Sequence, residues 1–310
     1  MKENFCTGID LLTERNALGE ILYDLQEFTK AKYCFEQALG GDYDAYLNIS
    51  KTSSLCLRAL TNLGMTLSCN ELGKKQEAER CIKKALPFIE KKTPDFPFRG
   101  RIFNNIAMVY YHHMIYAEAK TFLEKSFAYD KKQYGDNHPT LAIHLNNLGL
   151  VLKDLRQYEE AKKCIERALD IAERLYDENH PTLAIHLNNL GLVLQDLRQY
   201  EKAKKCIERA LDIDERVYDD NHPTLAIHLN NLNLRQYEEA KKCIERALAI
   251  AERVYDDNHP TLANHLNNLG LVLQDLRQYE EAKKFIERAL AIDERVYDNN
   301  HPTLATHTFE

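Results

Sequence analysis

The sequence predicts an all-α fold, an α-solenoid wound as a right-handed superhelix from about seven antiparallel helix pairs. A 42-residue stretch that begins at His138 returns at His180 with 5 of its 42 residues changed. Apolar residues within each stretch follow the 3–4 spacing of amphipathic helices, and a short break divides the stretch in two. Neither helix can bury its apolar stripe alone, whereas stacked helix pairs can.

The repeat period divides the 310 residues into seven units and the beginning of another. The first unit is degenerate, the sixth is shortened to 37 residues, and the last segment is a truncated start. The predicted units are 1–49, 50–93, 94–137, 138–179, 180–221, 222–258, 259–300 and the truncated 301–310. The breaks between their two helices are expected near Gln26, Gly73, Ile115, Arg156, Arg198, Arg235 and Arg277.

The fourth unit shows how one repeat is built. Pro139 suits a first helical position, because that position has no helical partner for the N–H that proline lacks. His138 precedes it and is expected at the helix boundary. The first helix then carries leucines at 3–4 spacing, and a second helix is expected to start near Tyr158 after the break at Arg156.

Small and apolar residues of this unit follow one pattern: Leu145-x2-Leu148-Gly149-x2-Leu152, then Ala161-x3-Ile165 and Ala168. This pattern resembles the tetratricopeptide repeat. The 42-residue period and the Asn-Asn-Leu and Asn-His-Pro signatures look like the kinesin light chain variety of that family. The resemblance implies a non-enzymatic scaffold that binds an extended peptide or a partner protein in a concave groove lined by the first helix of each pair.

Two positions depart from the family pattern. Leu145 stands where the family has a large aromatic residue near the start of the first helix. Arg156 stands where the family has a glycine in the turn between the two helices. Because non-glycine residues rarely adopt positive φ, we expect this turn to avoid it. Gly149 keeps the family's small residue, which lets the two helices of a pair approach closely.

A second stripe on the first helix of each repeat is predicted to line the groove. Asparagine amides in this stripe offer both donors and an acceptor, so a row of them can pair with a peptide backbone. One asparagine of each pair could instead satisfy a neighbouring helix. The predicted positions are Asn62, Asn104, Asn105, Ile143, Asn146, Asn147, Leu150, Ile185, Asn188, Asn189, Leu192, Asn230, Asn231, Asn267, Asn268 and Leu271.

Two arginines distinguish the N-terminal end of this stripe. Arg58 and Arg101 occupy the position that later repeats fill with isoleucine, such as Ile143. A guanidinium group there could hold an acidic side chain of a ligand. It could equally be a solvated arginine. Kinesin light chains are similar in preferring peptides with acidic flanks at that end.

The eight cysteines are predicted to be reduced packing residues. Five of them occupy one slot of the second helix, and phenylalanine fills the same slot in two other repeats. Stacked repeats would hold these thiols beyond the roughly 7 Å Cα separation that a disulfide allows. Reduced thiols favour a cytoplasmic location. The five cysteines are Cys34, Cys81, Cys164, Cys206 and Cys243, and the two phenylalanines are Phe122 and Phe285.

Metal binding, cofactor binding and catalysis are not predicted. Ten of the twelve histidines belong to the repeat, at a six-residue spacing (His138 and His144 in repeat four) that does not match a helical metal pair. The acidic pairs Asp219-Asp220 and Asp256-Asp257 lack the ligand spacing of a calcium loop. No nucleophile–base pair, phosphate loop or paired catalytic carboxylate stands out, so we expect a protein that is not an enzyme.

The composition narrows the class of partner. A net charge of −7, with no concentrated basic face, argues against nucleic acid. No run approaches about 18 apolar residues, so no membrane span is expected. Met1 to Asn16 contains no apolar run, so no signal peptide is expected either. A protein or peptide partner remains. The alternative function is a sensor or oligomerisation arm of a larger signalling or motor assembly, which the ending at Glu310 within an eighth first helix favours.

The short sixth repeat lacks five residues of its first helix. Five residues are about 7.5 Å of rise and about 140° of net rotation, so the helix cannot continue in register. We expect it to end near Asn233, with Leu234 as its last core anchor. The loss of core contacts predicts that this repeat is the weakest joint of the array.

Overall fold

The computed structural model describes residues 2–24, 27–40, 53–68, 74–91, 98–218, 222–231 and 237–296. All fourteen regular elements of these residues are α-helices, and they divide into two compact units, Met1–Arg156 and Gln157–Glu310. This confirms the predicted all-α array of helix pairs. The boundary between the units falls within the break of the fourth repeat.

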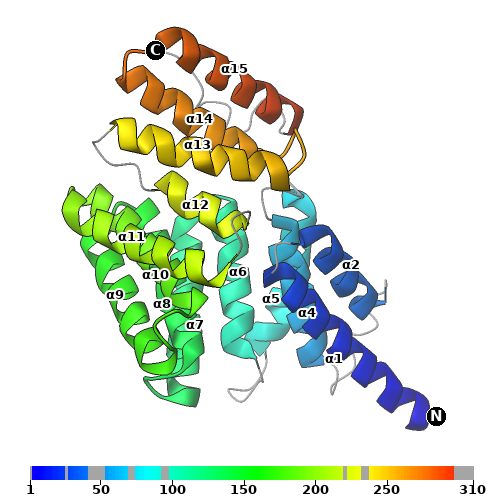
Figure 1. Ribbon diagram of the computed structural model, residues 1–310. Helices are drawn as coiled ribbons and strands as arrows, with labels where there is room; N and C mark the ends of the chain where they lie inside the picture. Colours follow the sequence, from blue (N-terminus) through cyan, green and yellow to red (C-terminus); the bar gives the residue numbers. More distant parts are fainter. Residues whose placement is uncertain are drawn as a thin grey trace. The chain divides into compact units, whose positions relative to one another are not determined.

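Unit 1 contains three helix pairs and the first helix of repeat four (Figure 1). In each pair the first helix packs on its partner, and α4 and α6 also pack on the first helix of the preceding pair. Its helices are α1 (Lys2–Asp24), α2 (Phe28–Leu39), α4 (Ser53–Ser68), α5 (Lys75–Lys91), α6 (Arg99–His112), α7 (Tyr116–Tyr134) and α8 (Pro139–Asp154).

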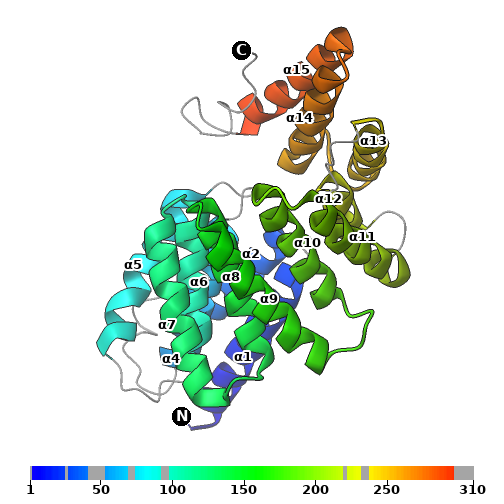
Figure 2. The same cartoon turned by 90° about the vertical axis from the view of Figure 1, so that its left-hand side faces the viewer.

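Unit 2 begins with the second helix of repeat four and continues with three pairs, whose α14 and α15 run side by side in Figure 2. Its helices are α9 (Tyr158–Leu175), α10 (Pro181–Asp196), α11 (Tyr200–Val217), α12 (Pro223–Asn231), α13 (Tyr237–Val254), α14 (Pro260–Asp275) and α15 (Tyr279–Val296). The breaks predicted at Ile115, Arg156, Arg198 and Arg277 are confirmed, whereas Gln26, Gly73 and Arg235 lie outside the described residues.

The predicted apolar stripes form the core. In repeat five, Leu183 and Leu187 of α10 and Ile207 of α11 are all at most 2% exposed. The two helices lie close together at Gly191, because a Cβ atom on it would lie 2.4 Å from Cγ1 of Ile207. The same distance recurs at Gly270, so the small residue of the repeat has a packing role.

The start of each first helix is fixed by its histidine. At His138, His180 and His259 the ring nitrogen Nδ1 accepts a hydrogen bond from the backbone N–H two residues later, which makes the histidine an N-cap. Each ring also stacks on a tyrosine four residues earlier, with centroids 3.9 Å apart for Tyr176 and His180. The predicted position of His138 at the helix boundary is confirmed.

The expectation that the Arg156 turn avoids positive φ is wrong. Arg156 has φ 60°, and Arg198 and Arg277 repeat it at 59° and 60°. The cause is the hydrogen bonding that ends the helix. The N–H of Arg198 donates to Gln195 at 2.8 Å and that of Gln199 to Leu194 at 2.8 Å, the two bonds of a Schellman motif. That motif requires a left-handed residue whether or not it is glycine.

The described part of the first helix of the sixth repeat, α12, covers 9 residues, whereas α10 and α14 each have 16. The predicted end near Asn233 and the proposed anchor Leu234 lie outside the described residues. Gln195 of repeat five donates a 2.9 Å hydrogen bond from its side chain to the carbonyl of Asn231. A side chain of the neighbouring repeat thus satisfies a carbonyl in the last described turn of α12.

Candidate functional site: a cavity lined by the first helices of unit 1

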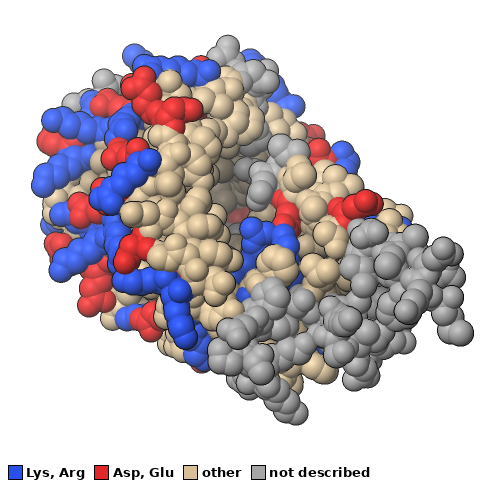
Figure 3. Space-filling view, turned by 90° about the horizontal axis from the view of Figure 1, so that it is seen from below, with Lys and Arg blue, Asp and Glu red and all other residues tan. Residues whose placement is uncertain are grey.

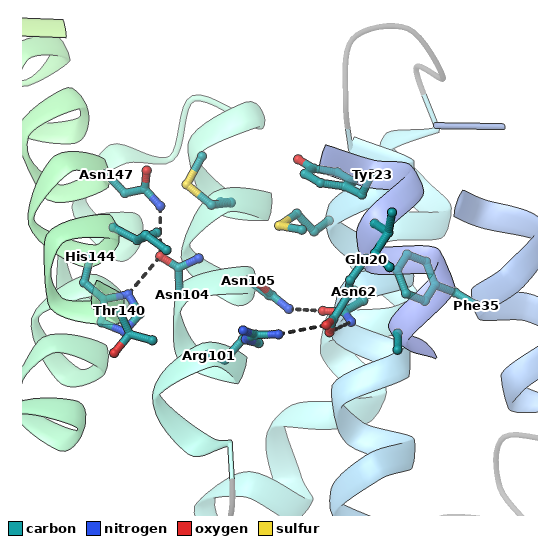
Figure 4. A pocket seen from close by; sticks show the side chains of 15 residues that line it. Glu20, Tyr23, Phe35, Asn62, Arg101, Asn104, Asn105, Thr140, His144 and Asn147 are labelled. Atoms are coloured by element: carbon teal, nitrogen blue, oxygen red, sulfur yellow. Dashed lines mark hydrogen bonds and ion pairs between the residues drawn. The ribbon is translucent and has the colours of Figure 1, made fainter. Parts of the chain in front are cut away.

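A cavity of about 550 Å³ lies in unit 1 between the first helices of repeats one to four. Helices α1, α4, α6 and α8 contribute almost all of its wall (Figure 4). Its volume is in the range of ligand pockets. Six of the predicted groove residues line it: Asn62, Arg101, Asn104, Asn105, Ile143 and Asn147.

Asparagines of adjacent repeats are joined into a ladder. In most rungs the second asparagine of one repeat donates to the first asparagine of the repeat before it, and Asn105 donates instead to the second, Asn62. The hydrogen bonds from second to first asparagines are Asn62 to Asn16 (3.1 Å), Asn147 to Asn104 (2.9 Å), Asn231 to Asn188 (3.0 Å) and Asn268 to Asn230 (3.1 Å). The ladder therefore continues through the short repeat of unit 2.

The ladder shows that these asparagines satisfy neighbouring helices, which is one of their two predicted roles, and contact with a ligand stays a prediction. The amide of Asn147 uses one N–H on Asn104, and an amide has a second N–H and a carbonyl oxygen. Asn147 is half-buried at the cavity wall, whereas Asn105 is only 3% exposed. Asn147 therefore stands at the wall where a ligand could reach it, while Asn105 is largely structural.

The two arginines meet a carboxylate that the sequence did not single out. Glu20 of α1 accepts hydrogen bonds from Arg58 Nε at 2.7 Å and from Arg101 Nη1 at 2.8 Å, and Arg58 Nη2 forms a further ion pair with it. Asn62 donates to the same carboxylate at 2.7 Å and Asn16 at 3.2 Å. Figure 4 shows that the side chain of Arg101 is directed at Glu20 along the wall of the cavity. We call these three charged side chains the Glu20 cluster.

The charge state of Glu20 follows from these contacts. Burial disfavours a carboxylate and by itself would raise the pKa. The hydrogen bond from Arg58 and the charge of Arg101 outweigh burial, so the pKa of Glu20 lies below its usual value. The cluster is therefore ionised near neutral pH. It also joins repeat one to repeat three, which are not neighbours in the array.

The opposite wall is set by His144 of α8. Its Nε2 lies 2.8 Å from Oδ2 of Asp130, and its Nδ1 lies 3.3 Å from Oδ1 of Asn104. Both His144 and Asp130 are buried. Asp130 is accommodated because Gly100 has no side chain, since a Cβ atom there would lie 2.0 Å from Oδ1 of Asp130.

Apolar side chains provide the rest of the lining. Ile21 and Ile143 are 57% and 47% exposed, which is unusual for isoleucines at the wall of a cavity. Met65 and Met108 add two flexible thioethers that adapt to the shape of a ligand. Of these residues, sequence reasoning identified only Ile143. Tyr23 and Phe35 complete the lining on the side of repeat one.

The remaining predicted residues lie on first helices outside the cavity lining. Asn146 is buried in unit 1, and Leu150 is half-buried. In unit 2 the apolar members are exposed or half-buried, whereas both asparagines of repeat five are buried. These unit 2 residues are Ile185, Asn188, Asn189, Leu192, Asn230, Asn231, Asn267, Asn268 and Leu271.

The remaining features of the described residues concern metal ligands, thiols and the hydropathy of the helices. Among those residues no group of three or more His, Cys, Asp or Glu side chains is placed to hold a metal ion. The six described cysteines whose side chains are placed are free, and burial raises the pKa of Cys56 to about 11 and of Cys81 to about 12. None of the helices in the described ranges is long and apolar enough to cross a membrane.

Charged side chains on the face shown in Figure 3 are of both signs and lie intermixed. Charged side chains of the second helices of unit 2 form regular ion pairs between repeats. Arg209 lies 2.7 Å from Glu173, Arg246 2.7 Å from Glu215, and Arg288 2.6 Å from Glu252. These side chains are 41–47% exposed, so their contribution to stability is small.

A sequence profile described as "Tetratricopeptide repeat" matches residues 98–174, 140–195, 182–232, 233–295 and 261–309. The chain belongs to the tetratricopeptide repeat (TPR) family. The resemblance noted in the sequence is thereby confirmed, and TPR folds are generally non-enzymatic folds for protein interaction. No curated protein matches the chain by sequence.

Solved structures share the TPR architecture. A Rap protein complexed with Competence and Sporulation Factor has a TM-score of 0.70 at 16% identity, over 93% of this chain and 78% of that one. The apo quorum sensor NprR from B. thuringiensis has 0.64 at 15%, over 99% and 80%. Kinesin light chain TPR-like repeats from Podosopora anserina have 0.52 at 22%, over 66% and 100%. At these identities the likeness shows the fold alone.

Proposed function

We propose that this TPR protein is a non-enzymatic, cytoplasmic scaffold that binds an extended peptide segment in the cavity of repeats one to four. The observation that carries the proposal is the composition of the cavity. Half-buried amides such as Asn147 stand beside exposed isoleucines and two methionines. A peptide needs both kinds of contact, because its backbone requires polar partners and its side chains require an apolar surface.

The proposal is kinesin light chain-like in its repeat type and in the use of the first-helix face. A sensor arm of a larger signalling assembly is the second candidate. It is supported by the likeness to a quorum sensor and to a Rap protein complexed with a factor. Both candidates require a ligand in the groove, so the same experiment tests them.

The test starts by panning a displayed random peptide library on the full chain. Binding of an enriched, fluorescein-labelled peptide is then measured by anisotropy for the parent protein and for Ile143→Asp. A buried charge opposite an apolar ligand side chain should weaken binding at least tenfold.

Leu18→Asp is the matched control. Leu18 also lies on a first helix of unit 1 and is 49% exposed, but it does not line the cavity. It should leave the affinity unchanged. Enriched peptides that bind both variants as well as they bind the parent protein would contradict the proposed site.

A further inference from the structure

Glu20 and Arg101 of the Glu20 cluster line the cavity with their charges paired to each other. The carboxylate of Glu20 is met by the fork of Arg58, by Arg101 and by two asparagine amides. A carboxylate has about four lone-pair sites, so these donors saturate it. An internal group therefore occupies the place that an acidic ligand side chain would need.

The guanidinium group of Arg58 is not available to a ligand, because Glu20 already binds it. Its Nε and Nη2 are both directed at Glu20, and its guanidinium lies 4.6 Å from the ring centroid of Phe98. Its side chain is 14% exposed. The two-pronged geometry that would recognise a carboxylate of a ligand is thus already in use.

Arg101 remains partly accessible, with 46% of its side chain exposed, but it shares Glu20 through Nη1. A ligand carboxylate approaching Arg101 would come next to the carboxylate of Glu20. Like charges at this separation repel, and the repulsion is stronger where water is partly excluded. To avoid it, the ligand would have to displace Glu20 from all of its donors.

An uncharged ligand side chain is not repelled by the carboxylate of Glu20. It leaves the Glu20 cluster intact and contacts Ile21, Ile143, Met65 and Met108. A large apolar side chain suits this lining, because methionine adapts to aromatic and aliphatic groups alike.

We infer, building on the proposed function, that Glu20 is a specificity-determining residue of the cavity. It holds Arg58 and Arg101 from within the chain, so that the cavity selects peptide segments with a large uncharged side chain and rejects acidic ones. This inference opposes the acidic ligand that the two arginines suggest from sequence.

The test uses the best peptide from the panning, with each position replaced in turn by Gln and by Glu. The parent protein should bind the Glu form at least tenfold more weakly than the Gln form at the positions that face the cluster. In Glu20→Gln this penalty should disappear or reverse, because the arginines become available. Glu124→Gln removes the same charge from an exposed site on α7 and should keep the penalty.

The outcomes separate the two proposals. If the parent protein binds the Glu form as tightly as the Gln form at every position, this inference is wrong and the proposed function stands; that comparison requires no variant to fold. Full retention of the penalty in folded Glu20→Gln also overturns it. A panning that enriches no peptide sensitive to Ile143→Asp overturns the proposed function and this inference with it.

Discussion

The second histidine of each repeat, on the first helix, occurs in two environments: beside an aspartate in unit 1 and in repeat six, and without one in repeats five and seven. In unit 1, His144 contacts Asp130 at 2.8 Å. In unit 2, His186 and His265 are 2% exposed, and both ring nitrogens of each lack a hydrogen-bond partner among the described residues. His228, also in unit 2, contacts Asp214 at 2.5 Å.

One position on the preceding second helix explains why some of these histidines have a carboxylate partner and others do not. The residue 14 positions before each histidine lies on the preceding second helix and is aspartate before His144 and His228 but alanine, Ala172 or Ala251, before the other two. Repeats four and five, which carry Ala172 and Asp214 at this position, differ at only 5 of 42 residues. The repeated residues therefore specify the helices and their packing, and single substituted positions specify the buried chemistry.

The largest expected effect is a loss of stability in acid. Burial lowers the pKa of His186 and of His265 to about 4, whereas an unfolded histidine titrates near 6.5. Below pH 6.5 the unfolded chain therefore binds protons that the folded chain does not. The free energy of unfolding should fall by about 1.4 kcal/mol per pH unit for each histidine until pH 4, as urea titrations can measure.

Other groups also respond to acid, including His112, whose pKa burial likewise lowers to about 4. The decisive quantity is therefore the change in slope between variants. Ala172→Asp places a carboxylate beside His186. It should reduce the slope of the unfolding free energy against pH by the contribution of one histidine, about 1.4 kcal/mol per pH unit. Asp214→Ala should steepen it. Equal slopes in both variants and the parent protein would contradict the role of this position.

The next effect compares charged groups of the two units. Glu20→Ala leaves Arg58 largely buried without its carboxylate and should cost roughly 1.5–3 kcal/mol. Glu173→Ala removes an exposed partner of Arg209 in unit 2 and should cost less than about 1 kcal/mol. Chemical denaturation of both variants checks the difference. A smaller cost at Glu20 than at Glu173 would show that the cluster does not stabilise unit 1.

A third comparison uses the close approach of the helices in a pair. Gly191→Ala would place a Cβ atom 2.4 Å from Ile207, so overpacking should cost about 1–3 kcal/mol. At Gly64 of unit 1 the nearest atom would lie 3.2 Å away, and Gly64→Ala should cost less. Thermal melts of the two variants give the comparison, and equal losses would contradict it.

The smallest effect should be the same in both units. Arg198 and Met114 hold φ values of 59° and 62°, a conformation in which a Cβ atom is strained. Arg198→Gly and Met114→Gly should each stabilise the protein by up to about 1 kcal/mol, because relief of strain exceeds the added entropy of the unfolded chain. A loss of stability in either variant would mean that its side chain contributes packing.

The period and the 3–4 spacing were sufficient to predict the helix pairs and the four described breaks. The left-handed turn residues were not predicted, because the backbone hydrogen bonds that end a helix impose φ on whatever side chain is present, as at Arg198. Composition and spacing also indicated the groove face but not the cavity, since a cavity depends on how helices of separate repeats pack.

Two signals in the sequence could have revealed more. Aligning Leu18-Gly19 with Leu148-Gly149 places Glu20 at the groove position of Leu150, opposite the two arginines. The change from Ala172 to Asp214 between two nearly identical repeats marks the position that partners the second histidine of the repeat. Neither signal gives distances, so the saturation of Glu20 required the structure.

Hydrogen–deuterium exchange of the full chain, with and without a panned peptide, tests the central claim most directly. A peptide in the unit 1 cavity should slow exchange in α1, α4, α6 and α8 and leave α10, α12 and α14 of unit 2 unchanged. Slower exchange confined to α10, α12 and α14 would contradict the account, because the nearly identical repeats would then hold the ligand.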